Sequence, residues 1–128
     1  MNTGLDDLAA SGSLPAVVSN YFAASDRDDI DAIVECFSED AVVRDEDRHW
    51  RGAQAIRQWR ESVATAYEYT VALIGSQALG EVDGGQRYAV YIHLEGNFPG
   101  GQVDLTNRFT LRGERIVGLE IVPTAVKS

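Results

Sequence analysis

The apolar positions in the first half of the chain recur every three or four residues, which is the spacing of a helix face. This pattern predicts three helices, over residues 14–25, 30–37 and 56–67. Pro15 is compatible with a first helical turn, and Asp28 or Asp29 is placed to cap the second helix. A short β-like run at residues 41–45 separates the second helix from the third.

The apolar positions in the second half alternate with polar ones, which is the period of a strand with one buried face. Four strands are predicted, at residues 69–79, 87–96, 103–112 and 115–122. Glycine-containing turns separate them, at residues 83–85, 98–101 and 112–114. Helices followed by a strand meander predict the α+β class, with the helices packed on one face of an antiparallel sheet.

The length of 128 residues fits one domain, which we expect at residues 14–123 between a flexible arm (1–13) and a C-terminal tail (124–128). The net charge of −9 argues against a nucleic-acid partner, because binding phosphates needs clustered lysine and arginine. The same charge disfavours an anionic membrane surface, and no apolar run is long enough to span a membrane.

The cysteine content bears on the compartment. The single cysteine, Cys36, cannot form an internal disulfide, so a reducing cytoplasm is the simpler location. Asp6 and Asp7 stand where a signal peptide would need basic residues and an apolar core. We therefore expect a cytoplasmic protein.

Three polar side chains share faces with apolar residues and should point into the interior. Asn107 is in phase with the apolar residues of the strand 103–112, and Asp45 with those of the run 41–45. Tyr21 lies on the apolar stripe of the first helix. A buried amide without a partner costs roughly 1–3 kcal/mol, and a buried carboxylate raises its pKa or finds a donor. The three groups therefore predict a polar site in an apolar interior.

Each of these side chains also has a purely structural interpretation. Asp45 could cap the loop that follows it, or pair with Arg48 or Arg51. Tyr21 could donate to a backbone carbonyl, and Asn107 could bond to a strand bulge or to a buried water.

Other charged groups give weaker signals. The stretch 44–51 alternates in charge and is typical of a solvated loop. His49 beside Asp45 and Asp47 lacks a paired ligand motif, so we expect no metal. His93 alternates with apolar neighbours and should lie on the outer face of the sheet.

Two segments carry a family resemblance, VVSNY at residues 17–21 and DIDAIVECFSEDAVVRD at residues 29–45. The segment AQAIR at residues 53–57 extends it to the third helix. Over residues 14–122 the chain resembles the ketosteroid isomerases and the wider SnoaL-like polyketide-cyclase group of the nuclear-transport-factor-2-like superfamily. The resemblance implies a cone-shaped NTF2-like fold, in which three N-terminal helices pack on a curved, mainly antiparallel sheet enclosing a pocket.

The resemblance also implies roles for individual residues. Tyr21 falls at the oxyanion-hole tyrosine of the isomerases, and Asp45 at their proton-shuttling aspartate. Asn107 occupies the place of the second oxyanion donor, which is a protonated aspartic acid in the isomerases. Trp59 falls at a pocket-lining aromatic position. The expected pocket walls are Trp50, Trp59, Val90, Ile92, Phe109 and Ile121.

These residues would support proton transfer next to a carbonyl without a cofactor, as in an isomerase or a polyketide-cyclase-like lyase. A non-catalytic protein that binds a hydrophobic metabolite in the same pocket is the alternative. In both cases the expected partner is a hydrophobic small molecule. Tyr91, His93 and Thr106 on the outer sheet face, together with the habit of the family, favour a homodimer through that face.

Overall fold

The computed structural model describes residues 14–124, so the predicted arm and residues 125–128 of the predicted tail lie outside the described residues. The three predicted helices are present as α2 (Ala16–Asp26), α3 (Ile30–Glu35) and α4 (Ala53–Ala66). The strands are β1 (Phe37–Asp45), β2 (Arg48–Arg51), β3 (Tyr69–Val82), β4 (Gly85–Gly96), β5 (Gln102–Arg112) and β6 (Arg115–Pro123). All five predicted β segments are therefore confirmed, with β2 as an addition.

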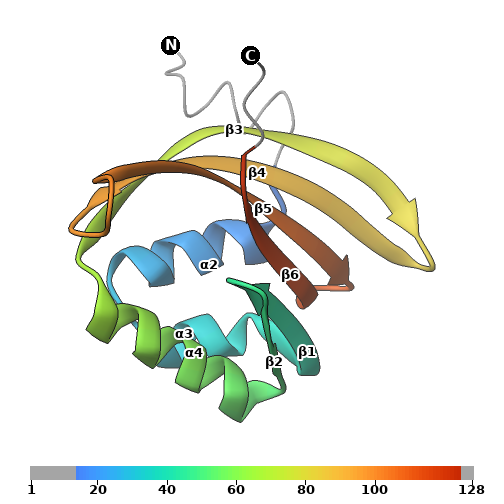
Figure 1. Ribbon diagram of the computed structural model, residues 1–128. Helices are drawn as coiled ribbons and strands as arrows, with labels where there is room; N and C mark the ends of the chain where they lie inside the picture. Colours follow the sequence, from blue (N-terminus) through green and yellow to red (C-terminus); the bar gives the residue numbers. More distant parts are fainter. Residues whose placement is uncertain (1–13, 125–128) are drawn as a thin grey trace.

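The six strands form one sheet in the order β2-β1-β6-β5-β4-β3. Only β1 and β6 run parallel; the other neighbouring pairs are antiparallel. The sheet curves around α2, and α3 and α4 lie on the same side of it, as Figure 1 shows. The predicted α+β fold, with helices on one face of a curved and mainly antiparallel sheet, is confirmed.

The stretch 44–51 is not a solvated loop, and that prediction is wrong. Residues Arg48–Arg51 pair with β1 as an antiparallel hairpin, in which Asp45 faces Arg48 and Val43 faces Trp50. The two-residue connection has φ values of 53° and 64°, at Glu46 and Asp47. Positive φ at both central positions is the mark of a type I′ turn, which fits the twist of two paired strands.

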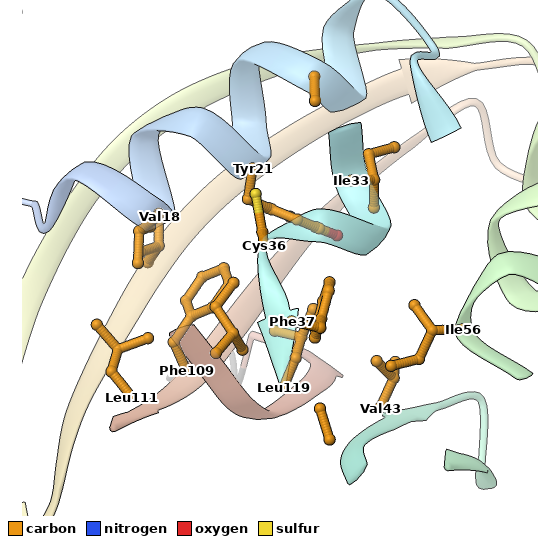
Figure 2. Close-up of a cluster of buried hydrophobic side chains, with 14 of the residues drawn as sticks. Val18, Tyr21, Ile33, Cys36, Phe37, Val43, Ile56, Phe109, Leu111 and Leu119 are labelled. Atoms are coloured by element: carbon orange, nitrogen blue, oxygen red, sulfur yellow. The ribbon is translucent and has the colours of Figure 1, made fainter. Parts of the chain in front are cut away.

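The core lies between the helices and the concave face of the sheet. Figure 2 shows its larger side chains, contributed by α2, α3, α4 and the strands. Tyr21 is part of this cluster, and its ring makes edge-to-face contacts with Phe22, Phe37 and Phe109 at centroid distances of 5.2, 5.9 and 5.6 Å. These contacts fix the ring, and so the place of its hydroxyl.

Two local features fix where an element begins or ends in this fold. Asp29 caps α3, because its Oδ1 accepts a hydrogen bond from the N–H of Ala32 at 3.2 Å, as predicted for this region. Gly96 ends β4 directly against the backbone carbonyl of Glu68 and the Cβ of Tyr69, where any side chain would collide. This close approach brings the start of β3 against β4.

Candidate functional site

A cavity of about 530 Å³ opens between α2, α4 and the concave face of the sheet. Its walls are mostly apolar or aromatic and come from both helices, from strands β3 to β6, and from the β4–β5 loop. Of the predicted site residues, it brings together Tyr21, Asp45, Trp59, Ile92, Asn107 and Ile121.

Three predicted wall residues do not line this cavity. Val90 and Phe109 are completely buried, with no exposed surface, and belong to the core beside it. Trp50 lies on β2, where the guanidinium of Arg48 stands 4.6 Å from its ring centroid. Strand alternation gives the face on which a side chain lies but not whether its neighbours cover it, and the cavity does not reach these three predicted wall residues. On β5 it is Val103, Leu105 and Asn107 that reach the cavity.

The register of the sheet explains how distant residues meet. Asp45 of β1 pairs with Ile121 of β6, which pairs with Asn107 of β5, which pairs with Val90 of β4. These four residues form one row across the inner face. Asp45 and Asn107 are two strands apart in this row, so their backbones are separated by roughly 10 Å.

Asp45 is a partly buried carboxylate with a tryptophan as its donor. The Nε1–H of Trp59 donates to Oδ2 of Asp45 at 3.0 Å. Burial raises the pKa of Asp45, and the opposing effects of the Trp59 N–H, the Arg60 charge and the Glu46 backbone N–H do not cancel it. Within residues 14–124, Asp45 forms no ion pair with Arg48 or Arg51.

Tyr21 supplies a neutral hydroxyl to the cavity. Its side chain is 3% exposed, and burial raises its pKa well above the ordinary value, a shift that the charge of Arg60 only partly opposes. The phenol therefore keeps its proton and can donate a hydrogen bond. Within the described part of the chain its hydroxyl makes no hydrogen bond.

Asn107 is the third polar group, and it is 2% exposed. Its amide oxygen is buried and has no hydrogen-bond partner among the residues that the structure describes. The structure therefore gives no support to the interpretation that Asn107 is satisfied by a backbone bulge. A buried amide atom without a partner is unusual and is often found where a ligand or water completes the site.

The sequence analysis missed Arg60, Tyr67, Tyr69 and Phe98, all of which line the cavity. The position of Arg60 in the sequence could have predicted its burial. It lies on the same stripe of α4 as Ile56 and Val63, four residues after the first and three before the second. A charged residue on an apolar helix stripe is an exception that points to a buried cation.

The outer face of the sheet carries a separate polar cluster. His93 is held between Asp104, 2.6 Å from its Nδ1, and Glu95, 3.0 Å from its Nε2. These two hydrogen bonds raise the pKa of His93. His93 lies outside the cavity, as its alternation with Ile92 and Leu94 predicts.

Within residues 14–124, no three His, Cys, Asp or Glu side chains gather in a way that could hold a metal ion. None of the helices in the same range has the length and apolar content needed to cross a bilayer. The homodimer through the outer face stays a prediction.

Comparison with known proteins places this geometry in a family. Residues 18–119 match the family model described as SnoaL-like domain. A candidate polyketide cyclase from Sinorhizobium meliloti is 36% identical, covers 85% of this chain and 95% of its own, and superposes with a TM-score of 0.75. No curated protein matches the sequence.

Two other solved structures are informative neighbours. An epoxide hydrolase/cyclase-like enzyme with a role in pyran ring formation in the polyether salinomycin is 27% identical. The alignment covers 85% of this chain and 88% of that enzyme, with a TM-score of 0.69. The orange carotenoid protein of Anabaena (Nostoc) sp. PCC 7120, which binds canthaxanthin, is 21% identical with a TM-score of 0.77. The alignment covers 91% of this chain but only 38% of the carotenoid protein, and it shows the shared fold alone.

Proposed function

The chain belongs to the family of SnoaL-like domains, and on that premise we propose that it catalyses proton transfer next to the carbonyl of an apolar small molecule, with Asp45 as the base. The single observation that carries the proposal is the environment of Asp45. It is a carboxylate on the wall of an apolar cavity, held by the Trp59 N–H and, within residues 14–124, forming no ion pair with Arg48 or Arg51. Desolvation strengthens a carboxylate as a base, because it destabilises the charged form.

The proposed reaction uses the two other polar groups as donors. Asp45 takes a proton from the carbon next to the carbonyl, and the electrons of the broken C–H bond form an enolate. Tyr21 and the –NH₂ group of Asn107 donate hydrogen bonds to the enolate oxygen and so stabilise its charge. The proton held by Asp45 then returns to another carbon, as in an isomerase. In a cyclase, the enolate carbon attacks a second carbonyl instead, and the proton passes from Asp45 to the alkoxide that forms.

A second candidate is a protein that binds an apolar metabolite without turning it over. The observation that favours it is Asn107, because an amide is a weaker hydrogen-bond donor than the neutral carboxylic acid that the isomerases carry at this place. The largely apolar walls of the cavity suit such a ligand equally well. The two candidates differ in one measurable respect, which is the rate of proton exchange.

The test uses β-tetralone, an apolar bicyclic ketone with exchangeable α-protons, in deuterated buffer. Proton NMR follows the loss of the α-proton signals with and without protein. We expect the protein to accelerate exchange and Asp45→Asn to remove about 99% or more of that acceleration. Asp40→Asn, an exposed carboxylate on the same strand, is the matched control and should leave exchange unchanged.

Two outcomes would contradict the proposal. Undiminished exchange in Asp45→Asn would show that another group is the base. Binding of β-tetralone by the wild-type protein without any acceleration of exchange would favour the second candidate, the binding protein.

A further inference from the structure

Arg60 is the only charged side chain in the buried class among residues 14–124. It lies on the inward stripe of α4 and lines the cavity together with Trp59 and Val63. Its side chain is 5% exposed, although arginine is rarely buried without a partner. The catalytic proposal above does not require a cation at this position.

Within residues 14–124, Asp28 is the only carboxylate within 4.0 Å of the Arg60 guanidinium, although the more distant Asp45 also interacts with its charge. The Nη2 of Arg60 donates to the hydroxyl of Ser25 at 3.1 Å, which is a neutral partner. The carboxylate of Asp28 lies 3.9 Å from the same Nη2, and its side chain is 70% exposed, so water screens it. The buried Nε–H has no hydrogen-bond partner within residues 14–124. A buried guanidinium with an unmatched donor is unfavourable unless a further acceptor approaches it, and an anion is the strongest such acceptor.

The position of the guanidinium relates it to the proposed base. Its carbon lies 5.4 Å from the ring centroid of Trp59, the residue whose N–H donates to Asp45. The cation and the carboxylate therefore lie in the same cavity and share Trp59 as a neighbour. The walls around them are supplied by apolar side chains such as Val71 and Leu94.

We propose that Arg60 binds the carboxylate of an otherwise apolar ligand, so that the substrate class is apolar keto acids rather than neutral ketones. The substrate part of this inference rests on the proposed function. A carboxylate can accept two hydrogen bonds from one guanidinium, and it supplies the charge that Ser25 and Asp28 do not. Glu46 and Asp47 also line the cavity, but both are exposed and their charges are screened by water.

The experiment compares two probes of the same shape, 2-naphthoate and 2-naphthamide, by isothermal titration calorimetry at neutral pH. We expect the wild-type protein to bind the carboxylate about tenfold or more tightly than the amide, because a hydrogen bond to a charged group is the stronger one. Arg60→Gln should remove this preference. Arg57→Gln should preserve it, because Arg57 lies on the same helix and forms an ion pair with the exposed Asp31.

The wild-type comparison needs no variant, so it remains decisive if Arg60→Gln fails to fold. Equal binding of the two probes by the wild-type protein would overturn the inference, and so would a preference that survives in Arg60→Gln. Such results alongside Asp45-dependent exchange would leave the proposed function standing. An Arg60-dependent preference combined with exchange that is insensitive to Asp45 would overturn the proposed function and leave Arg60 as a carboxylate-binding residue.

Discussion

The two faces of the sheet each carry a titratable group whose pKa is raised, Asp45 on the inner face and His93 on the outer face. The direction is the same but the causes are opposite. Burial raises the pKa of Asp45 because the charged carboxylate is poorly solvated. Hydrogen bonds from the ring N–H groups to the carboxylates of Asp104 and Glu95 raise the pKa of His93 because they favour the charged imidazolium. A raised pKa therefore means that the charged form of Asp45 is disfavoured on the inner face and that the charged form of His93 is favoured on the outer face.

The pairing of polar atoms differs in the same way. Both ring nitrogens of His93 have carboxylate partners, at 2.6 and 3.0 Å. Around the cavity, the Asn107 amide oxygen on the inner face and the Arg60 Nε on α4 have no hydrogen-bond partner among residues 14–124. The polar atoms of the outer cluster already have hydrogen-bond partners within the protein. The polar atoms around the cavity that lack such partners are available to a ligand. This contrast supports the inner face as the side of the proposed function.

The largest effect should come from Asp45→Asn, which removes the disfavoured charge and keeps an acceptor for the Trp59 N–H. We expect proton exchange to fall by about a hundredfold to ten-thousandfold. Stability should rise at neutral pH, with a melting temperature a few degrees higher, because active-site groups are often destabilising. The sign follows from the raised pKa, since the ionised carboxylate destabilises the folded state increasingly as pH rises.

Calorimetric melting across pH checks this prediction. The gap between Asp45→Asn and wild type should be widest above the raised pKa and should close below the ordinary aspartate value of about 3.9. Asp40→Asn serves again as the control, because its carboxylate is exposed. A variant less stable than wild type at neutral pH would mean that the charge of Asp45 is structural, and the contrast between the faces would fail.

Asn107→Leu should have the second-largest effect. Leucine has a similar shape but no donor for an enolate oxygen, and loss of one such donor costs about a hundredfold to a thousandfold in rate. Stability should be unchanged or higher, because the substitution also removes a buried oxygen that has no partner. Exchange rates and chemical denaturation of the same samples test both parts. A clear loss of stability would show that the amide is satisfied in solution.

Much of this site was predictable from periodicity. The inward positions of Tyr21, Asp45 and Asn107 follow from helical and strand spacing, and the register of the sheet then places Asp45 and Asn107 in one row. The hydrogen bond from Trp59 to Asp45 joins a helix to a strand and depends on tertiary packing. Spacing alone identifies the two faces but not which groups meet on them.

The failures of the sequence analysis have physical reasons. Phe109 lies on the correct face but too deep along its strand to reach the cavity. The hairpin at residues 45–48 was missed because Glu46 and Asp47 adopt the left-handed conformation without the usual Asn-Gly signal. Arg60 was missed because a charged residue, even one on an apolar stripe, is normally assigned to the surface.

Trp59→Phe should have a smaller effect on the exchange rate, and it tests whether the pKa seen in that rate belongs to Asp45. The variant loses the N–H that lowers the pKa of Asp45, so that pKa should rise further. The acid limb of the exchange profile should therefore move to higher pH, while the rate on the plateau falls by less than about tenfold. Trp50→Phe is the control, since Trp50 lies outside the cavity. An unmoved limb would mean that the observed pKa does not belong to Asp45.

His93→Gln should have the smallest effect and tests the outer half of the comparison. The raised pKa of His93 means that its charged form stabilises the folded state below the ordinary value of about 6.5, and that this contribution is lost as pH rises through the raised value. Wild type should thus be slightly more stable than His93→Gln near pH 6, and the difference should vanish in alkaline buffer. The difference should be small because exposed ion pairs contribute little.

Melting curves of wild type and His93→Gln from pH 6 to alkaline buffer test this prediction. The exchange of β-tetralone is measured on the same samples. Tyr91→Phe is the matched variant, because it removes a hydroxyl that donates to Gln77 on the same face and leaves His93 and its two carboxylate partners in place. A stability difference that ignores pH would show that the His93 ring acts by packing and not by charge. A change in the exchange rate would show that the two faces of the sheet are coupled, so that the outer cluster could no longer be treated as independent of the cavity.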